Sequence, residues 1–154
     1  MTIADLLDPA AVTLRVSAPG KRQVLSVIAD VAARVLGVDA DAVLDGLMER
    51  EAAGSTGVGH GVAIPHARVD GIERVRAIFV RLETPVAFGS VDDKPVDLLV
   101  ALLAPRDASA QHLRALARVS RMMRQPELRE QLRQARSVDA VNVLLAHQAT
   151  SSAA

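Results

Sequence analysis

The segment from Gly54 to Gly71 contains the residues of this chain best suited to chemistry. It reads GSTGVGHGVAIPHARVDG, a glycine-rich loop followed by a short apolar run that ends on Pro65 and His66. A neutral imidazole is a competent nucleophile near neutral pH and can carry a covalent group between a donor and an acceptor. We expect Pro65 to end a buried strand and His66 to lie at the tip of that strand, at the edge of a sheet. On position alone, a surface histidine without a function explains His66 equally well.

Two other residues favour phosphoryl chemistry. His112 is predicted to lie about one turn into the helix that follows the most apolar strand, where free backbone N–H groups and the helix dipole attract anions. Arg50 lies near the end of the helix that leads into the glycine loop, although an arginine there more commonly only offsets the helix C-terminus. With His66 as the nucleophile, His112 and Arg50 suit a transferring phosphoryl group, whose transition state spreads negative charge over three oxygens.

The glycine spacing does not fit a nucleotide-binding loop. Gly54 and Gly59 are spaced as in a P-loop, but His60 stands where the phosphate-binding lysine belongs. A dinucleotide fingerprint fails because Val62 occupies the position of its third glycine, and because the loop leads into a strand rather than a helix. We therefore expect no nucleotide here.

A metal site is the other alternative for the same histidines. None of the candidate ligands has the i, i+4 helical spacing of a zinc-protease pair, and no acid flanks them as a general base would. Without that spacing we expect no metal ion and no cofactor. The candidate ligands considered for such a site are His60, His66, His112 and Asp70.

The composition argues against several other classes of function. The chain has 154 residues, no cysteine and only two aromatic residues, Phe79 and Phe88. Disulfide and thiolate chemistry are therefore excluded, and single-stranded nucleic acid has no aromatic platforms on which to stack. No apolar run approaches the roughly 20 residues of a membrane span, and no secretory leader opens the chain. We expect a cytoplasmic protein, built on one domain, that binds no nucleic acid and does not insert into a membrane.

Charge is unevenly distributed although the net charge is zero. Residues 106–136 contain eight arginines and only three acidic residues. A solvated helical face explains this excess, and so does a docking surface for an acidic partner. In the second case, binding should weaken as ionic strength rises.

Hydrophobic periodicity predicts strands and helices in alternation. The helices are expected to lie before, between and after the strands, so we predict an α/β fold with a sheet covered by helices on both faces. We expect Ser17 to cap the first long helix and residues 148–154 to form a flexible C-terminal tail. Strands are predicted near residues 12–16, 61–65, 75–82 and 96–105, the last of them central, and helices over 17–36, from 39 or 41 to about 51, and from 108, 126 and 137 onward.

The sequence STGVGHGVAIPHARV closely resembles the active-site signature of type-2 enzyme IIA domains of the bacterial phosphoenolpyruvate-dependent phosphotransferase system. This is the mannitol, fructose and nitrogen-regulatory class. The stretches LETPVAF, DDKPVDLLVALLAP and HLRALARVSRMMR extend the likeness over roughly residues 2–147, and their wording is most similar to the nitrogen-regulatory branch. Arg68 follows Ala67 where many members have Gly and then Lys or Arg, a difference that could tune docking.

The resemblance implies a fold, a reaction and a set of partners. It implies a compact domain over residues 1–147 with a mixed β-sheet between helices. His66 would be phosphorylated on Nε2 by a small histidine-phosphorylated carrier protein, without magnesium or nucleotide, and Arg50 and His112 match the residues that stabilise the phosphate. His60 is common in this loop type, and we interpret it as structural.

Three functions are compatible with that implication. The first is a phosphotransferase component that carries a phosphoryl group and regulates nitrogen, carbon or potassium metabolism, with targets such as sensor kinases or potassium transporters. The second is a sugar-specific enzyme IIA that donates phosphate to an enzyme IIB transporter component. The third is a binding module whose affinity for a kinase or channel depends on its phosphorylation state.

Overall fold

The computed structural model describes residues 2–151, and six strands within them form one mixed sheet. The strand order is β1–β5–β6–β3–β2, and β4 pairs with β6 off this path. The pairs β1–β5, β3–β6 and β4–β6 are parallel, whereas β5–β6 and β2–β3 are antiparallel. The strands are β1 (Leu7–Val16), β2 (Gly57–Gly59), β3 (Val62–Ala63), β4 (His66–Arg68), β5 (Arg76–Val86) and β6 (Val96–Ala104).

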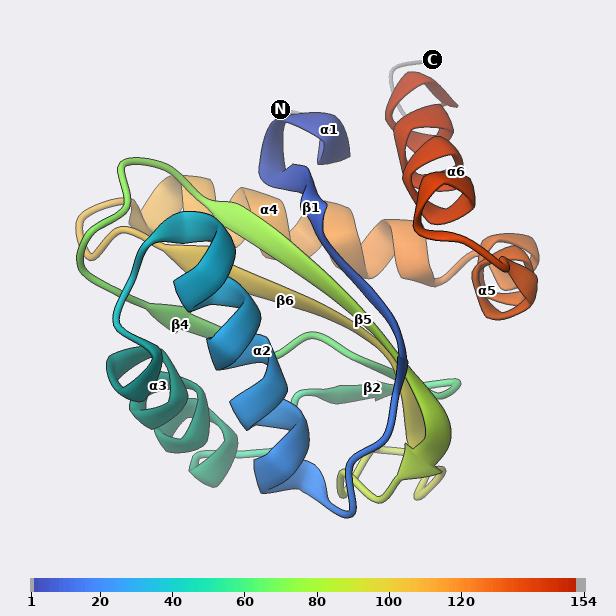
Figure 1. Ribbon diagram of the computed structural model, residues 1–154, viewed down its shortest axis with the longest axis horizontal. Helices are drawn as coiled ribbons and strands as arrows, with labels where there is room; N and C mark the ends of the chain where they lie inside the picture. The colour runs from blue at the N-terminus through green and yellow to red at the C-terminus, as the bar shows by residue number, and fades with distance from the viewer. Residues whose placement is uncertain (1, 152–154) are drawn as a thin grey trace.

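Helices cover both faces of this sheet, as predicted (Figure 1). The helices α2 and α3 pack together on one face, and α4 crosses the other. The helices α5 and α6 follow α4, and α6 packs on β1 and α1. The helices are α1 (Ile3–Leu6), α2 (Lys21–Leu36), α3 (Ala40–Ala52), α4 (Ser109–Met123), α5 (Pro126–Gln134) and α6 (Val138–Ser151).

The helix boundaries follow the capping signals in the sequence with one exception. The side chain of Asp39 accepts a hydrogen bond from the backbone N–H of Ala42 at the start of α3. At the start of α6 the Ser137 hydroxyl accepts one from the backbone N–H of Ala140. The Ser17 cap was wrong, because α2 begins only at Lys21, after an extended Gly20. The proline at position 19 disfavours helical geometry in the residue before it, which keeps the chain extended past Ser17.

Strand β6 is the centre of the fold. It pairs with three other strands, and every residue in it is buried except Asp97. The two phenylalanines of the chain, Phe79 and Phe88, are fully buried beside aliphatic side chains. No helix in the described part of the chain is long and apolar enough to cross a bilayer. Helix α6 continues through Ser151, and the rest of the expected tail lies outside the described residues.

The strand predicted to end at Pro65 is instead divided in two. Residues 62–63 pair with Leu98 and Leu99 of β6, and after two residues the chain pairs again, with His66 opposite Leu102. Pro65 has no N–H to donate, so it interrupts the ladder, but its carbonyl accepts from the Leu102 N–H at 2.9 Å. His66 is therefore the first residue of β4, a short strand that pairs with β6 and with no other described strand. It lies at an edge of the sheet, as predicted, but it begins a new strand instead of ending the one before it.

Candidate functional site

His66 is held in one orientation and one tautomer. Its Nδ1 lies 2.9 Å from the carbonyl oxygen of Ile64. A carbonyl can only accept a hydrogen bond, so the ring proton is assigned to Nδ1 and the lone pair to Nε2. The Nε of Arg50 donates to that Nε2 over 3.1 Å. The nitrogen free to attack an electrophile is therefore Nε2.

Arg50 makes two hydrogen bonds, one at the helix end and one to His66. It lies in the last turn of α3, where its Nη1 donates to the Gly54 carbonyl over 2.8 Å and closes the turn into the glycine loop. Its Nε donates to Nε2 of His66 at the same time. The helix end thus fixes the guanidinium beside the histidine, and five N–H donors in a planar fork are well suited to phosphoryl oxygens.

His112 packs edge-on against His66 from the opposite face of the sheet. The two ring centroids lie 5.4 Å apart and the ring planes are at 83°. His112 is only 6% exposed, and its Nε2 has no hydrogen-bond partner among the described residues. A buried polar atom without a partner is rare and costly. In the tautomer with its proton on Nε2, His112 offers a donor to an anion placed beside His66.

A cavity of about 660 Å³ opens over the two histidines. Its polar lining includes Arg50, Arg68 and Arg106, and its apolar lining includes Leu113, which is 69% exposed. Arg68 lies two residues after His66 on β4, and side chains at that spacing share a face of a strand. The cavity therefore brings together two histidines and an excess of positive charge.

Burial and nearby cations favour the neutral form of both histidines. Burial is the largest cause that lowers the pKa of His66, and the Arg50 guanidinium lowers it further, while the bond to Ile64 and the Glu51 carboxylate oppose them. Burial also lowers the pKa of His112 to about 4, with help from His66 and Arg68. Near neutral pH the His66 ring is therefore uncharged, the form that a nucleophile requires.

We predict that His112 makes the protein less stable in mild acid. Unfolded His112 titrates near pH 6.5 and folded His112 near 4, so the unfolded state binds more protons between these values. The stabilising contribution is complete above pH 6.5 and is lost as the pH falls toward 4, by about 3 kcal/mol. Urea unfolding at pH 7.5 and 4.5 measures this loss, and His112→Gln should lose correspondingly less stability. Equal losses in the two proteins would contradict the assignment.

The other histidine of the loop lies elsewhere. The backbone N–H of His60 donates to Asp92 over 2.9 Å, and its carbonyl accepts from Arg133 over 2.6 Å. Its φ of 58° is the left-handed conformation, and it lines a different cavity from His66. The remaining metal candidate, Asp70, pairs with Arg106 at 2.7 Å. No three histidine, aspartate or glutamate side chains within residues 2–151 gather as a metal site would need.

The basic segment 106–136 does not form one free face. Arg133 pairs with Asp97 and bonds the glycine loop, and Arg106 pairs with Asp70. Arg129 is buried and donates to the Met123 carbonyl at the end of α4. Arg129 and Arg133 are thus engaged in contacts within the fold, whereas the Arg106–Asp70 pair is exposed and contributes little to stability. A docking role for the other arginines stays a prediction.

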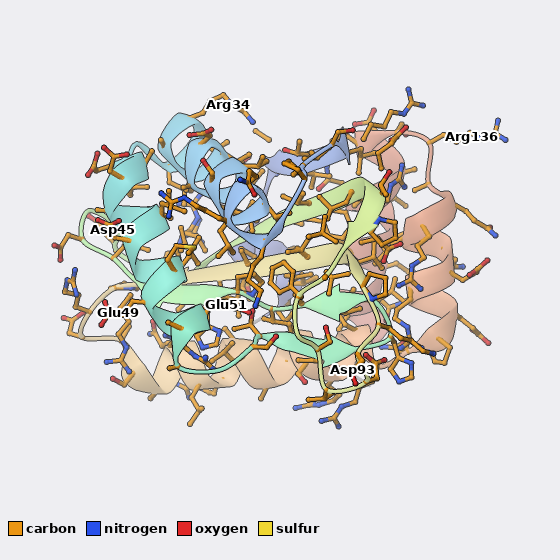
Figure 2. All side chains as sticks on the ribbon, turned by 90° about the horizontal axis from the view of Figure 1, so that it is seen from below. Arg34, Asp45, Glu49, Glu51, Asp93 and Arg136 are labelled. Atoms are coloured by element: carbon orange, nitrogen blue, oxygen red, sulfur yellow. The ribbon has the colours of Figure 1, made fainter. Side chains whose placement is uncertain are left out.

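Sequence reasoning missed Glu51. This residue lies in the last turn of α3 next to Arg50, and only 4% of its side chain is exposed. Figure 2 shows it under α3 within the body of the molecule, while Asp45 and Glu49 lie at the outer edge. A carboxylate in the last turn opposes the helix dipole, and that conflict was a signal that something else holds the residue there.

The comparisons with known proteins identify the family of this chain. Residues 5–148 match the family model described as "Phosphoenolpyruvate-dependent sugar phosphotransferase system, EIIA 2". A nitrogen regulatory protein of Bradyrhizobium diazoefficiens is 41% identical over 146 residues, which cover 95% of each chain. The fructose-specific EIIA component of Haloferax volcanii is 40% identical over 108 residues, 70% of each chain.

A solved structure gives the same result for the fold. The crystal structure of the nitrogen regulatory protein IIA-Ntr from Neisseria meningitidis superimposes with a TM-score of 0.87. It is 32% identical and covers 93% of this chain and 98% of its own. This chain therefore belongs to the type-2 enzyme IIA family of the phosphoenolpyruvate-dependent phosphotransferase system, whose members are phosphotransferase components.

Proposed function

We propose that this protein carries a phosphoryl group on Nε2 of His66, receives it from a histidine-phosphorylated carrier protein, and acts as a regulator in the cytoplasm. The observation that carries the proposal is the His66 ring, whose Nδ1 proton is engaged by Ile64 and whose Nε2 lone pair faces Arg50. The unsatisfied Nε2 of His112 beside it supports the same reading.

The transfer needs no change of proton at the reacting nitrogen. The Nε2 lone pair forms a bond to phosphorus while the N–P bond of the donor histidine breaks and its electron pair returns to the donor ring. The His66 ring keeps its Nδ1 proton and becomes positive, and the Ile64 carbonyl stabilises that charge. Arg50 releases Nε2 and turns its N–H groups to the phosphoryl oxygens, where an N–H of His112 adds a further donor.

Names of similar proteins favour a regulatory role over sugar transport. The Bradyrhizobium and Neisseria relatives are both named nitrogen regulatory proteins. We infer that the carrier is of the corresponding nitrogen type and that the two phosphorylation states regulate nitrogen, carbon or potassium metabolism. The targets would be proteins such as sensor kinases or potassium transporters.

One comparison favours a second function. The Haloferax relative is a fructose-specific EIIA component, which supports a sugar-specific enzyme IIA that donates phosphate to an enzyme IIB. A reconstituted membrane system separates the two, because only the second makes sugar phosphorylation depend on this protein. In a third reading the protein is a binding module for a kinase or channel, and pull-downs of both phosphorylation states would test it.

The carrier role is tested by incubation with phosphoenolpyruvate and the two upstream carrier proteins, followed by intact mass at alkaline pH. We expect a mass gain of one phosphoryl group that is lost in acid, as phosphohistidine is. If carriers shown to phosphorylate one another leave this protein unchanged, the proposed function is wrong.

A further inference from the structure

A continuous chain of hydrogen bonds leads from Glu51 to the ring of His66. Both carboxylate oxygens of Glu51 accept from the Thr56 backbone N–H, at 3.0 and 3.2 Å, and Oε2 also accepts from the Thr56 hydroxyl at 2.5 Å. The Thr56 carbonyl accepts from the Ile64 N–H at 3.0 Å. The other end of the Ile64 residue, its carbonyl, accepts the Nδ1 proton of His66.

The charge of Glu51 is satisfied by one partner from a distant helix. Lys21, the first residue of α2, places its Nζ 2.9 Å from Oε1 of Glu51. The same Nζ lies 4.9 Å from the centre of the Phe88 ring, which adds a cation–π contact. A buried carboxylate stays charged only when it is paired and hydrogen-bonded. The Glu51–Lys21 pair has its own ion pair, three hydrogen bonds from Thr56 to Glu51, and the cation–π contact of Lys21 with Phe88.

The glycine loop makes this anchoring necessary. Between α3 and β4 the strands β2 and β3 are only three and two residues long, and the connecting glycines have little intrinsic preference for one conformation. Ile64 and Pro65 also lie between the segments that pair with β6, and the Ile64 N–H bonds instead to Thr56, the residue before β2, in the register of the β2–β3 pair. Thr56 takes the place of a strand partner for that residue.

We propose that Glu51 is a positioning residue for His66: paired with Lys21, it fixes Thr56 and, through the Thr56–Ile64 bond, the carbonyl that keeps the ring proton of His66 on Nδ1. The inference rests on the proposed function for its meaning, since an Nδ1 proton is what leaves Nε2 free for phosphorus. What it states about the molecule is only which ring nitrogen of His66 carries the proton. Partners that orient a metal-binding histidine in this way typically change activity by 10-fold to 100-fold, and we expect an effect of that order on the reaction of His66.

The test reads the tautomer directly. Long-range ¹H–¹⁵N NMR of the ¹⁵N-labelled, unphosphorylated protein distinguishes protonated from unprotonated ring nitrogens. We expect His66 to be protonated on Nδ1 alone in the wild type, and Glu51→Gln to show a measurable share of the Nε2–H form. The rate of labelling by phosphoramidate, a small chemical phosphodonor, should fall about 10-fold in the variant.

Matched variants separate positioning from general stability. Thr56→Val removes the hydroxyl bond and should shift the tautomer in the same direction, whereas Thr56→Ser keeps the bond and should behave as the wild type. Asp45→Asn removes an exposed charge from the same helix and should change neither readout. If Glu51→Gln does not fold, the two Thr56 variants decide the question.

An unchanged Nδ1–H tautomer in folded Glu51→Gln or in Thr56→Val would overturn the proposal and leave Glu51 a stabilising residue only. The result does not depend on the carrier function, because no phosphodonor is present during the NMR measurement. A tautomer shift in a protein that no carrier phosphorylates would uphold the positioning role and refute the proposed function.

Discussion

His66→Gln is expected to fold like the wild type and to take up no phosphoryl group. An amide is not a nucleophile at this pH, so the labelling rate should fall by more than about 10³-fold. The loss of fold should be small, because the His66 ring is only half-buried and its partners Arg50 and Ile64 are held by other bonds. Labelling is measured by intact mass after incubation with phosphorylated carrier, and folding by far-ultraviolet circular dichroism.

His60→Asn is the matched control for this prediction. His60 belongs to the same glycine loop, its ring is exposed, and asparagine tolerates its positive φ. The Asn variant should keep the wild-type labelling rate. Substantial labelling of folded His66→Gln would mean that another residue accepts the phosphoryl group, and the assignment of the nucleophile would be wrong.

Arg50→Met is expected to slow phosphoryl transfer to His66 by about 10²-fold, the usual cost of removing one donor from a site of developing negative charge. Arg50 is the only side chain with a described hydrogen bond to the nucleophilic Nε2. Met keeps much of the apolar stem but neither the charge nor the donors. Rapid-quench measurement of the transfer step under single-turnover conditions separates it from docking.

Arg34→Met controls for the loss of an arginine at a helix end. Arg34 lies in the last turn of α2 and is exposed, and Figure 2 shows it at the outer edge of the molecule, apart from Glu51. The Arg34→Met variant should accept the phosphoryl group at the wild-type rate. An Arg50→Met variant that transfers within about threefold of the wild type would leave Arg50 with the helix-end role alone.

The fold was predictable where local signals and burial agree. The apolar run 96–105 indicated the central strand because both faces of β6 are covered, and Asp39, Pro126 and Ser137 mark helix starts because their caps act within a few residues. The pairing of β4 with β6 was not predictable. The chain stops pairing with β6 at Ile64 and Pro65 and resumes pairing at His66, and no local sequence pattern encodes that register.

The proximity of the three candidate site residues was predictable from the sequence, but the hydrogen bonds and ion pairs around them were not. His66, Arg50 and His112 come together as the sequence indicated, although 16 residues separate the bonded pair and α4 brings His112 from the other face of the sheet. The long-range bonds of Glu51 and Lys21, and the pairing of Arg133 with Asp97, follow from tertiary packing. A charge count therefore could not tell a structural arginine from a free one.

The central claim is that Nε2 of His66 receives the phosphoryl group, and NMR of the phosphorylated, ¹⁵N-labelled protein tests it most directly. The ring ¹⁵N shifts and the coupling to ³¹P identify the residue and the nitrogen that carry phosphorus. The account predicts a phosphorus bond on Nε2 of His66 with a proton retained on Nδ1, since the Ile64 carbonyl occupies the other side of the ring. Phosphorus on Nδ1, or on any other residue, would contradict it.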